Sequence, residues 1–218
     1  IIAIPLLLDL LELKGKTITI DAVGCQKSIA SLIKEKKANY VFGLKKNHPN
    51  LYKAASDLKV REGEKNENRL HDVFEDGHGR SVRRRYFSYN ARTIGGIDDW
   101  QGAKSIIAVE TISSKSSTPQ TPVTSQWRYY LSSHPWNHPK LATYIRHHWG
   151  IENKLHWVLD VQFKEDDDQK AERKSALSFA LLRRIALNIV RTRDTTPKRS
   201  VKRKLKRSGW DNEYLKDL

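Results

Sequence analysis

The first sixty residues alternate between two spacings of apolar side chains. Helical spacing over residues 6–13 is followed by β-branched alternation over residues 17–23, and the pair of patterns then repeats over 28–37 and 39–44. A further helix is predicted from Pro49 to about residue 60. The order helix, strand, helix, strand, helix predicts an α/β sheet with parallel strands, whose ligands gather beyond the strands' carboxyl ends.

The pattern changes after residue 60. Polar, turn-rich segments separate short β-like runs at residues 69–74, 81–89, 104–112 and 126–131, which predict an inserted antiparallel sheet. Helical spacing returns after Pro139, over residues 141–160 and 171–193. A basic segment, which we expect to be a tail, closes the chain.

Glu152 interrupts the apolar stripe predicted for the helix at 141–160. At about 100° per residue, Leu141, Ile145 and Leu159 fall within roughly 20° of Glu152 around the axis. A buried carboxylate costs several kcal/mol unless a cation, a proton or a metal ion compensates it, so the stripe predicts such a partner.

Composition and charge narrow the class of protein. The chain has 218 residues with 38% apolar content, enough for a folded core, and its net charge of +15 favours an anionic polymer or an anionic membrane surface as partner. The apolar opening, residues 1–13, is too short to span a bilayer, so no membrane insertion is expected. Cys25 is the only cysteine, which excludes an internal disulfide and fits a reducing cytosol. Since the sequence contains no Met and opens on a core-like helix, we expect it to begin inside a longer protein.

Two carboxylates are candidates for a metal site. Asp21 closes a predicted strand, where it is either a helix cap or a ligand at the sheet edge, and Glu152 lies 131 residues later. Mg²⁺ usually takes one or two protein carboxylates together with phosphate and water. His148, Glu152 and His156 could instead hold zinc, although three groups over two helical turns span roughly 12 Å, too far for one shared ion.

A basic, aromatic run is the main candidate for nucleic-acid contact. Residues 80–92 hold five arginines and no acid, with Tyr86, Phe87 and Tyr89 interleaved, a composition that suits phosphate contact and base stacking. A solvated strand face is the alternative. The turn Gly77-His-Gly-Arg80 before it would let backbone approach a phosphate.

Several segments together resemble the DDE transposases of bacterial insertion sequences, in particular the H-repeat-associated protein group. They are Ile18-Thr-Ile-Asp-Ala-Val-Gly-Cys-Gln26, Tyr40-Val-Phe-Gly-Leu-Lys-Lys-Asn-His-Pro49, Gly77-His-Gly-Arg80, the stretch from His148-Trp-Gly-Ile-Glu-Asn to Asp166, and Ala180-Leu-Leu-Arg-Arg-Ile-Ala-Leu-Asn188.

The resemblance implies an α/β fold with an RNase H-like catalytic core, an inserted antiparallel β region and C-terminal helices. The core would occupy residues 1–60 and 136–195, the insertion 61–135 and the basic tail 196–218. Asp21 and Glu152 would be the second and third acids of a triad that holds Mg²⁺ or Mn²⁺ for attack on a phosphodiester. The first acid and the first strands would lie upstream of Ile1, leaving Ile18 and Ile20 partly uncovered.

We therefore expect a metal-dependent DNA transposase that cleaves and transfers strands at insertion-sequence ends, with DNA affinity but little or no strand transfer in this fragment. A catalytically dead DNA-binding or regulatory remnant is the alternative, and a zinc hydrolase is a third reading. A full-length member would act as a homodimer or higher oligomer on DNA, in the bacterial cytoplasm near the nucleoid. The residues assigned to DNA contact are Lys45, Lys46, Asn47, His78, Arg80, Arg83, Arg84, Arg85, Arg146, His148, Trp149, Lys154 and His156.

Overall fold

The computed structural model describes residues 3–77, 80–115, 124–168, 172–196 and 199–218. Two compact units divide the chain, Ile1–His148 and Trp149–Leu218, called unit 1 and unit 2 below. None of the helices among the described residues is long and apolar enough to cross a membrane.

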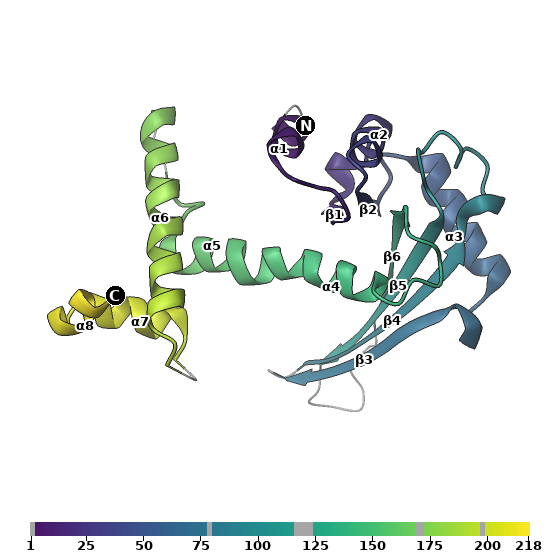
Figure 1. The fold of residues 1–218 in the computed structure, drawn as a ribbon. Helices are drawn as coiled ribbons and strands as arrows, with labels where there is room; N and C mark the ends of the chain where they lie inside the picture. The colour runs from purple at the N-terminus through teal and green to yellow at the C-terminus, as the bar shows by residue number, and fades with distance from the viewer. Residues whose placement is uncertain (1–2, 78–79, 116–123, 169–171, 197–198) are drawn as a thin grey trace. The chain divides into compact units, whose positions relative to one another are not determined.

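Unit 1 is a mixed α/β structure built on one sheet (Figure 1). Its described helices and strands are α1 (Ala3–Leu10), β1 (Thr17–Ile20), α2 (Lys27–Glu35), β2 (Asn39–Leu44), α3 (Pro49–Glu62), β3 (Arg69–Gly77), β4 (Arg80–Asn90), β5 (Ser105–Lys115), β6 (Thr124–Ser132) and the greater part of α4 (Leu141–Ile151), with short 3₁₀ turns between them.

The sheet has the strand order β1-β2-β6-β5-β4-β3. β1 and β2 are parallel, as the sequence predicts, and every other neighbouring pair is antiparallel. β6 pairs directly with β2, so the strands predicted as an insertion continue the sheet that β1 and β2 begin.

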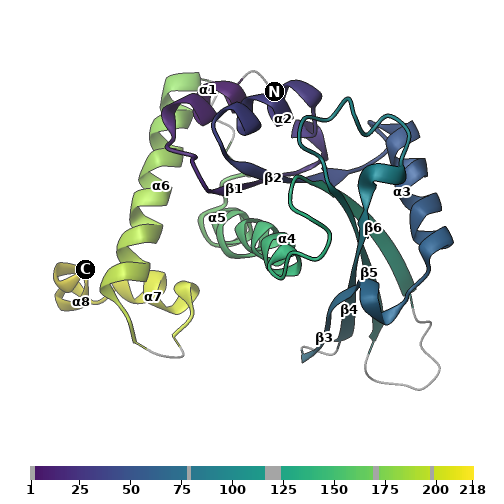
Figure 2. The same cartoon turned by 45° about the vertical axis from the view of Figure 1, so that its right-hand side comes forward.

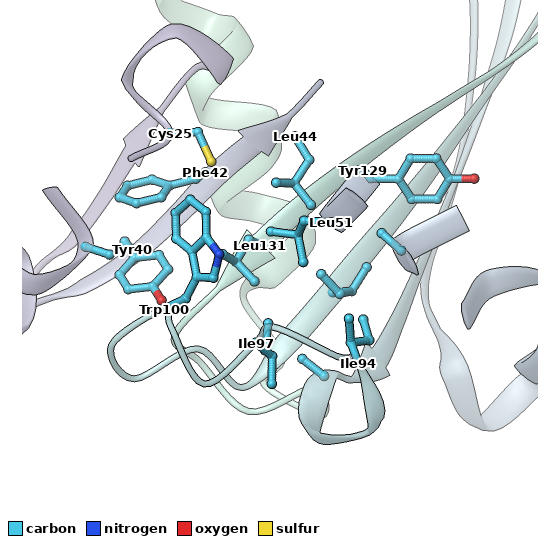
Figure 3. Close-up of a cluster of buried hydrophobic side chains, with 14 of the residues drawn as sticks. Cys25, Tyr40, Phe42, Leu44, Leu51, Ile94, Ile97, Trp100, Tyr129 and Leu131 are labelled. Atoms are coloured by element: carbon cyan, nitrogen blue, oxygen red, sulfur yellow. The ribbon is translucent and has the colours of Figure 1, made fainter. Parts of the chain in front are cut away.

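The core of unit 1 follows from strand alternation. In β2, Tyr40, Phe42 and Leu44 point to the face covered by α2 and α3, where they meet Cys25, Leu51 and Trp100 (Figure 3). Residues of the opposite parity are buried as well, among them Val41, Ile107, Val109 and Tyr130. The central strands are therefore covered on both faces.

β1 is an edge strand with less cover. Ile18 and Ile20 pack against the core but are only half-buried, which agrees with the expected partial exposure. Cys25, by contrast, is fully buried and free, and burial raises the pKa of its thiol to about 12. It is a core side chain.

Unit 2 consists of helical segments. A π-helical turn, Glu152–His156, leads into α5 (Trp157–Phe163), and α6 (Arg173–Arg193), α7 (Val201–Ser208) and α8 (Asn212–Asp217) follow. The segment expected to be a basic tail thus contains α7 and α8, which follow the C-terminal end of α6 (Figure 2).

The interior of unit 2 is small. Val158, Leu159 and Leu187 are buried together, whereas Leu177 and Leu181, part of the apolar body predicted for α6, are 64% and 60% exposed. Polar contacts of Asp194 with Tyr214 and Lys204 also hold the unit together.

Candidate functional site

Asp21 immediately follows β1, at the carboxyl edge of the two parallel strands. Its Oδ1 accepts hydrogen bonds from the backbone N–H groups of Val23 (3.1 Å) and Gly24 (3.4 Å), so the side chain caps the 3₁₀ turn Ala22–Gly24. Both bonds use one carboxylate oxygen, and the residue is exposed. Asp21 is therefore a cap whose second oxygen faces away from these bonds.

The loop after β2 lies against this turn. Asn47 donates from Nδ2 to the carbonyl of Ala22 (2.7 Å), and His48 Nε2 lies 2.6 Å from the carbonyl of Cys25. The backbones also come close at Gly43, since a Cβ there would stand 3.3 Å from the amide nitrogen of Ala22. The structure therefore brings Asp21, Lys45, Lys46 and Asn47 to one edge of the sheet.

A pocket of about 770 Å³ opens between these two loops. Val23 and Ala22 contribute to its wall from one loop, and Lys45, Lys46 and Asn47 line it from the other. The lysines are exposed. The pocket lies beside the turn that Asp21 caps.

Two histidines bond to the outer strand. His134 Nε2 lies 2.9 Å from Thr17 Oγ1, and His148 Nδ1 lies 3.2 Å from Thr19 Oγ1. Thr17 and Thr19 have the same parity along β1, so both histidines contact one face of this edge strand. His148 is thereby hydrogen-bonded to the strand that Asp21 follows.

Sequence reasoning missed His134 and His48. Burial, with the charges of His138, Lys34 and Lys104, lowers the pKa of His134 to about 4, so the ring is neutral near pH 7. His48 follows Lys45 and Lys46 in the loop after β2, and His134 follows β6, so the contacts of both depend on strand pairing that the local sequence does not contain.

The prediction that Glu152 is buried in an apolar stripe is wrong. Glu152 is exposed, although Leu141, Ile145 and Leu159 are buried as expected. The apolar cover of this helix is interrupted around Glu152, since Ile151 and Trp157 are exposed as well. The π turn that begins at Glu152 changes the 100° spacing only for the residues after it. π turns inside α-helices occur frequently at functional sites.

The arginines of β4 are paired with acids from other segments. Arg83 forms a two-point ion pair with Asp72 (2.9 and 2.7 Å), and this hydrogen bonding lowers the pKa of Asp72. Arg84 bonds to Glu75 at 2.5 Å.

Arg85 is the most enclosed of the three arginines. It contacts Glu64 at 2.8 Å and the buried Glu110, whose other oxygen accepts from Ser125 at 2.7 Å. Residues 80–92 contain no acid, but the pairing of β4 with β3 and β5 places acids of other segments beside these arginines.

The remaining predicted DNA contacts are dispersed. Arg146 pairs with Glu75, Trp149 is half-buried, and Lys154 and His156 are exposed in unit 2. His78 and the side chain of Arg80 lie outside the described residues. These assignments stay predictions.

The acidic segment after α5 binds arginines of α6. Asp168 pairs with Arg183 at 2.8 Å and Glu165 with Arg184 at 2.9 Å. Two segments on which the family resemblance depends are thus joined by ion pairs.

The chemistry of the donor atoms indicates which side chains could bind a metal ion. Among the described residues no three His, Cys, Asp or Glu side chains form a group that could hold a metal ion. Asp21 offers carboxylate oxygen at an exposed edge, the donor type that Mg²⁺ prefers, and Glu152 is an exposed carboxylate too.

Comparison with known proteins identifies a transposase family. The family described as "Transposase DDE domain" matches residues 2–189. Two proteins of Escherichia coli (strain K12), YbfL and the one named "H repeat-associated putative transposase YhhI", are each 37% identical to the chain over 222 residues, covering 99% of it and 57% of the relative. A protein of Escherichia coli O157:H7 named "Putative transposase YncI" is 36% identical over 224 residues, covering 100% of the chain and 56% of the relative.

The chain therefore spans little more than half the length of these relatives. No solved structure matches it.

Proposed function

Because the chain belongs to the transposase DDE domain family, we propose that it is the metal-binding and DNA-binding part of a DNA transposase with an RNase H-like core. The reaction class would be cleavage and transfer of phosphodiester bonds at the ends of an insertion sequence. Asp21 and Glu152 would be two of its acidic ligands.

The position of Asp21 carries this proposal. Its exposed carboxylate stands at the carboxyl end of a parallel strand, where ligands of α/β sheets bind, and Lys45 and Lys46 follow the neighbouring strand. One acidic and two basic side chains at one edge suit a cation and a phosphate together.

The role of Glu152 with Asp21 rests on the resemblance of their two segments to the transposase family, which the match over residues 2–189 supports. Both carboxylates are exposed.

Mg²⁺ or Mn²⁺ fits the donor set, since two carboxylates with phosphate and water satisfy such ions. The chemistry that such an ion supplies is activation of a water or a DNA 3′-hydroxyl and neutralisation of charge on the phosphate. The chain's own contribution would be to hold Asp21 through its two backbone hydrogen bonds and to place Lys45 and Lys46 near the phosphate.

The test is Mn²⁺ binding, followed by electron paramagnetic resonance, for the chain and for Asp21→Asn and Glu152→Gln. We expect each substitution to weaken binding about tenfold or more. Asp57→Asn and Glu213→Gln are matched controls, because they remove exposed carboxylates that pair with the exposed Lys53 and Lys216. Equal binding by all five proteins would contradict the assignment.

DNA binding is measured in parallel by fluorescence anisotropy at several salt concentrations. Contacts from lysine and arginine to phosphates predict that the logarithm of the association constant falls linearly with the logarithm of the salt concentration. DNA binding that is indifferent to Mn²⁺ and to both substitutions would favour a regulatory DNA-binding protein, and stoichiometric zinc would favour a hydrolase.

A further inference from the structure

Hydrogen bonds from polar side chains beside the pocket hold together the loops after β1 and β2. Asn47 and His48 direct their side-chain nitrogens to backbone carbonyls of the opposite loop. Lys27, at the start of α2, pairs with Asp99 at 2.7 Å. These three side chains build the wall and are not left over for a ligand.

Lys45 and Lys46 differ from them. Within the part of the chain that the structure describes, neither forms a side-chain hydrogen bond or ion pair, and both are exposed on the pocket lining. Two ammonium groups that form no ion pair favour an anion, and the volume of about 770 Å³ lies within the roughly 300–1,000 Å³ of small-ligand sites.

Val23 adds an apolar side chain to a lining that also contains the polar Gln26 and Ser28. Val23 is 65% exposed, and it is held at the pocket by the turn that Asp21 caps. An exposed β-branched side chain beside two free cations suits a ligand with a flat apolar body and a negative group. A nucleotide has both.

From these observations we infer that the pocket takes one unstacked nucleotide of a DNA strand, with its base against Val23 and its phosphate facing Lys45 and Lys46. The inference rests on the proposed function and adds a substrate subsite to it. A base inside a duplex cannot enter such a pocket, so the nucleotide must be unpaired or turned out of the stack, which costs a few kcal/mol and least at an unpaired position.

The experiment uses the full chain and two short duplexes that contain 2-aminopurine, whose fluorescence rises when it is unstacked. In one duplex the 2-aminopurine is paired with thymine, and in the other it is an unpaired single-nucleotide bulge. We expect about tenfold tighter binding of the bulged duplex, with a rise in fluorescence on binding.

Val23→Trp fills the pocket at an exposed position, and it should abolish both the preference for the bulge and the fluorescence rise. Val60→Trp, at a 73% exposed position on α3, is the control and should change neither. Lys45→Ala/Lys46→Ala should lower the salt dependence of binding by about two phosphate contacts. Lys14→Ala/Lys16→Ala removes the same charge at the amino end of β1 and should not lower it by that amount.

The outcomes distinguish failure of this nucleotide subsite from failure of the proposed DNA binding. Equal binding of the two duplexes without a fluorescence rise, or an unchanged response in Val23→Trp, would overturn the nucleotide pocket and leave the DNA-binding proposal standing. Failure to bind either duplex at low salt would overturn both.

Discussion

The interiors of the two units differ in the kinds of side chain that stabilise them. Unit 1 has an apolar core that extends from Leu8 in α1 to Leu131 in β6. Unit 2 combines a small apolar cluster with a buried polar group, Asp194, which accepts a hydrogen bond from Tyr214 at 2.6 Å and pairs with the buried Lys204. A third bond comes from the backbone of Thr196 at 2.9 Å.

This difference predicts different sensitivities. Apolar burial is non-directional and depends little on pH or salt, whereas a buried ion pair depends on both partners being present and charged. A cavity in the apolar core should therefore act mainly on unit 1, and loss of the charge on Asp194 or Lys204 mainly on unit 2.

The largest effect is expected from Phe42→Ala in unit 1. Phe42 is fully buried and stacks on Tyr40 with ring centroids 4.5 Å apart. The cavity should lower the free energy of unfolding of unit 1 by about 3–5 kcal/mol, measured by hydrogen–deuterium exchange of unit 1 peptides in the full chain. Phe74→Ala, at a 66% exposed position of β3, is the control and should cost far less. Equal losses in the two variants would refute an apolar core as the source of stability.

The next effect concerns the polar centre of unit 2. Asp194→Asn keeps an acceptor for Tyr214 but leaves Lys204 buried without its charged partner, so thermal unfolding and exchange of unit 2 should shift to lower stability. The double variant Asp194→Asn/Lys204→Met should recover part of the loss, and Asp167→Asn, an exposed carboxylate of the same unit, should have no such effect. If unit 1 lost protection to the same extent, the two interiors would not be independent.

Acid should weaken the two units in separate pH ranges. His134 in unit 1 has its pKa lowered from 6.5 to about 4, so the unfolded chain binds a proton first and unit 1 loses stability as the pH falls through that range. Hydrogen bonds from Thr196 and Tyr214, with Lys204, lower the pKa of Asp194, so its stabilisation is present above the ordinary value of 3.8 and is lost below it.

Exchange measured between pH 7 and pH 3 checks this order. His134→Gln should flatten the change in unit 1 between pH 6.5 and pH 4. Asp194→Asn should leave that change as it is. Loss of protection in unit 2 above pH 5 would contradict the assignment to Asp194.

The smallest effect is expected at exposed ion pairs. Lys53→Ala in unit 1 and Lys216→Ala in unit 2 break pairs of 2.7 and 2.8 Å between exposed side chains. Each should change stability by no more than about 0.5 kcal/mol in chemical denaturation. A large loss of stability in either variant would show that exposed ion pairs, and not the interiors, account for the difference between the units.

Periodicity predicted the elements of unit 1 well because its core is apolar. The strand at 39–44 and the start of the helix at Pro49 agree with β2 and α3, since each alternation is satisfied by a buried face. Asp21 at the carboxyl edge, with Lys45, Lys46 and Asn47, followed from parallel pairing alone.

Polar contacts between distant segments could not be predicted in this way. The partners of Arg83, Arg84 and Arg85 are fixed by the register of β3, β4 and β5, which no local count of charges contains. Neither the exposure of Glu152 nor the π turn that begins at this residue is indicated by the local apolar pattern.

That π turn also has a consequence for how the helical segment tolerates change in length. A π turn accommodates one residue more than α-helical winding, so deleting a single residue within Glu152–His156 should restore an α turn and preserve the hydrogen-bonded ladder. A π turn with its extra residue sweeps about the same angle as an α turn without it, so the residues after the deletion should stay on nearly the same face of the helix axis. The π turn thus absorbs the extra residue locally, and a lineage that loses it would keep the helix with its apolar positions in register.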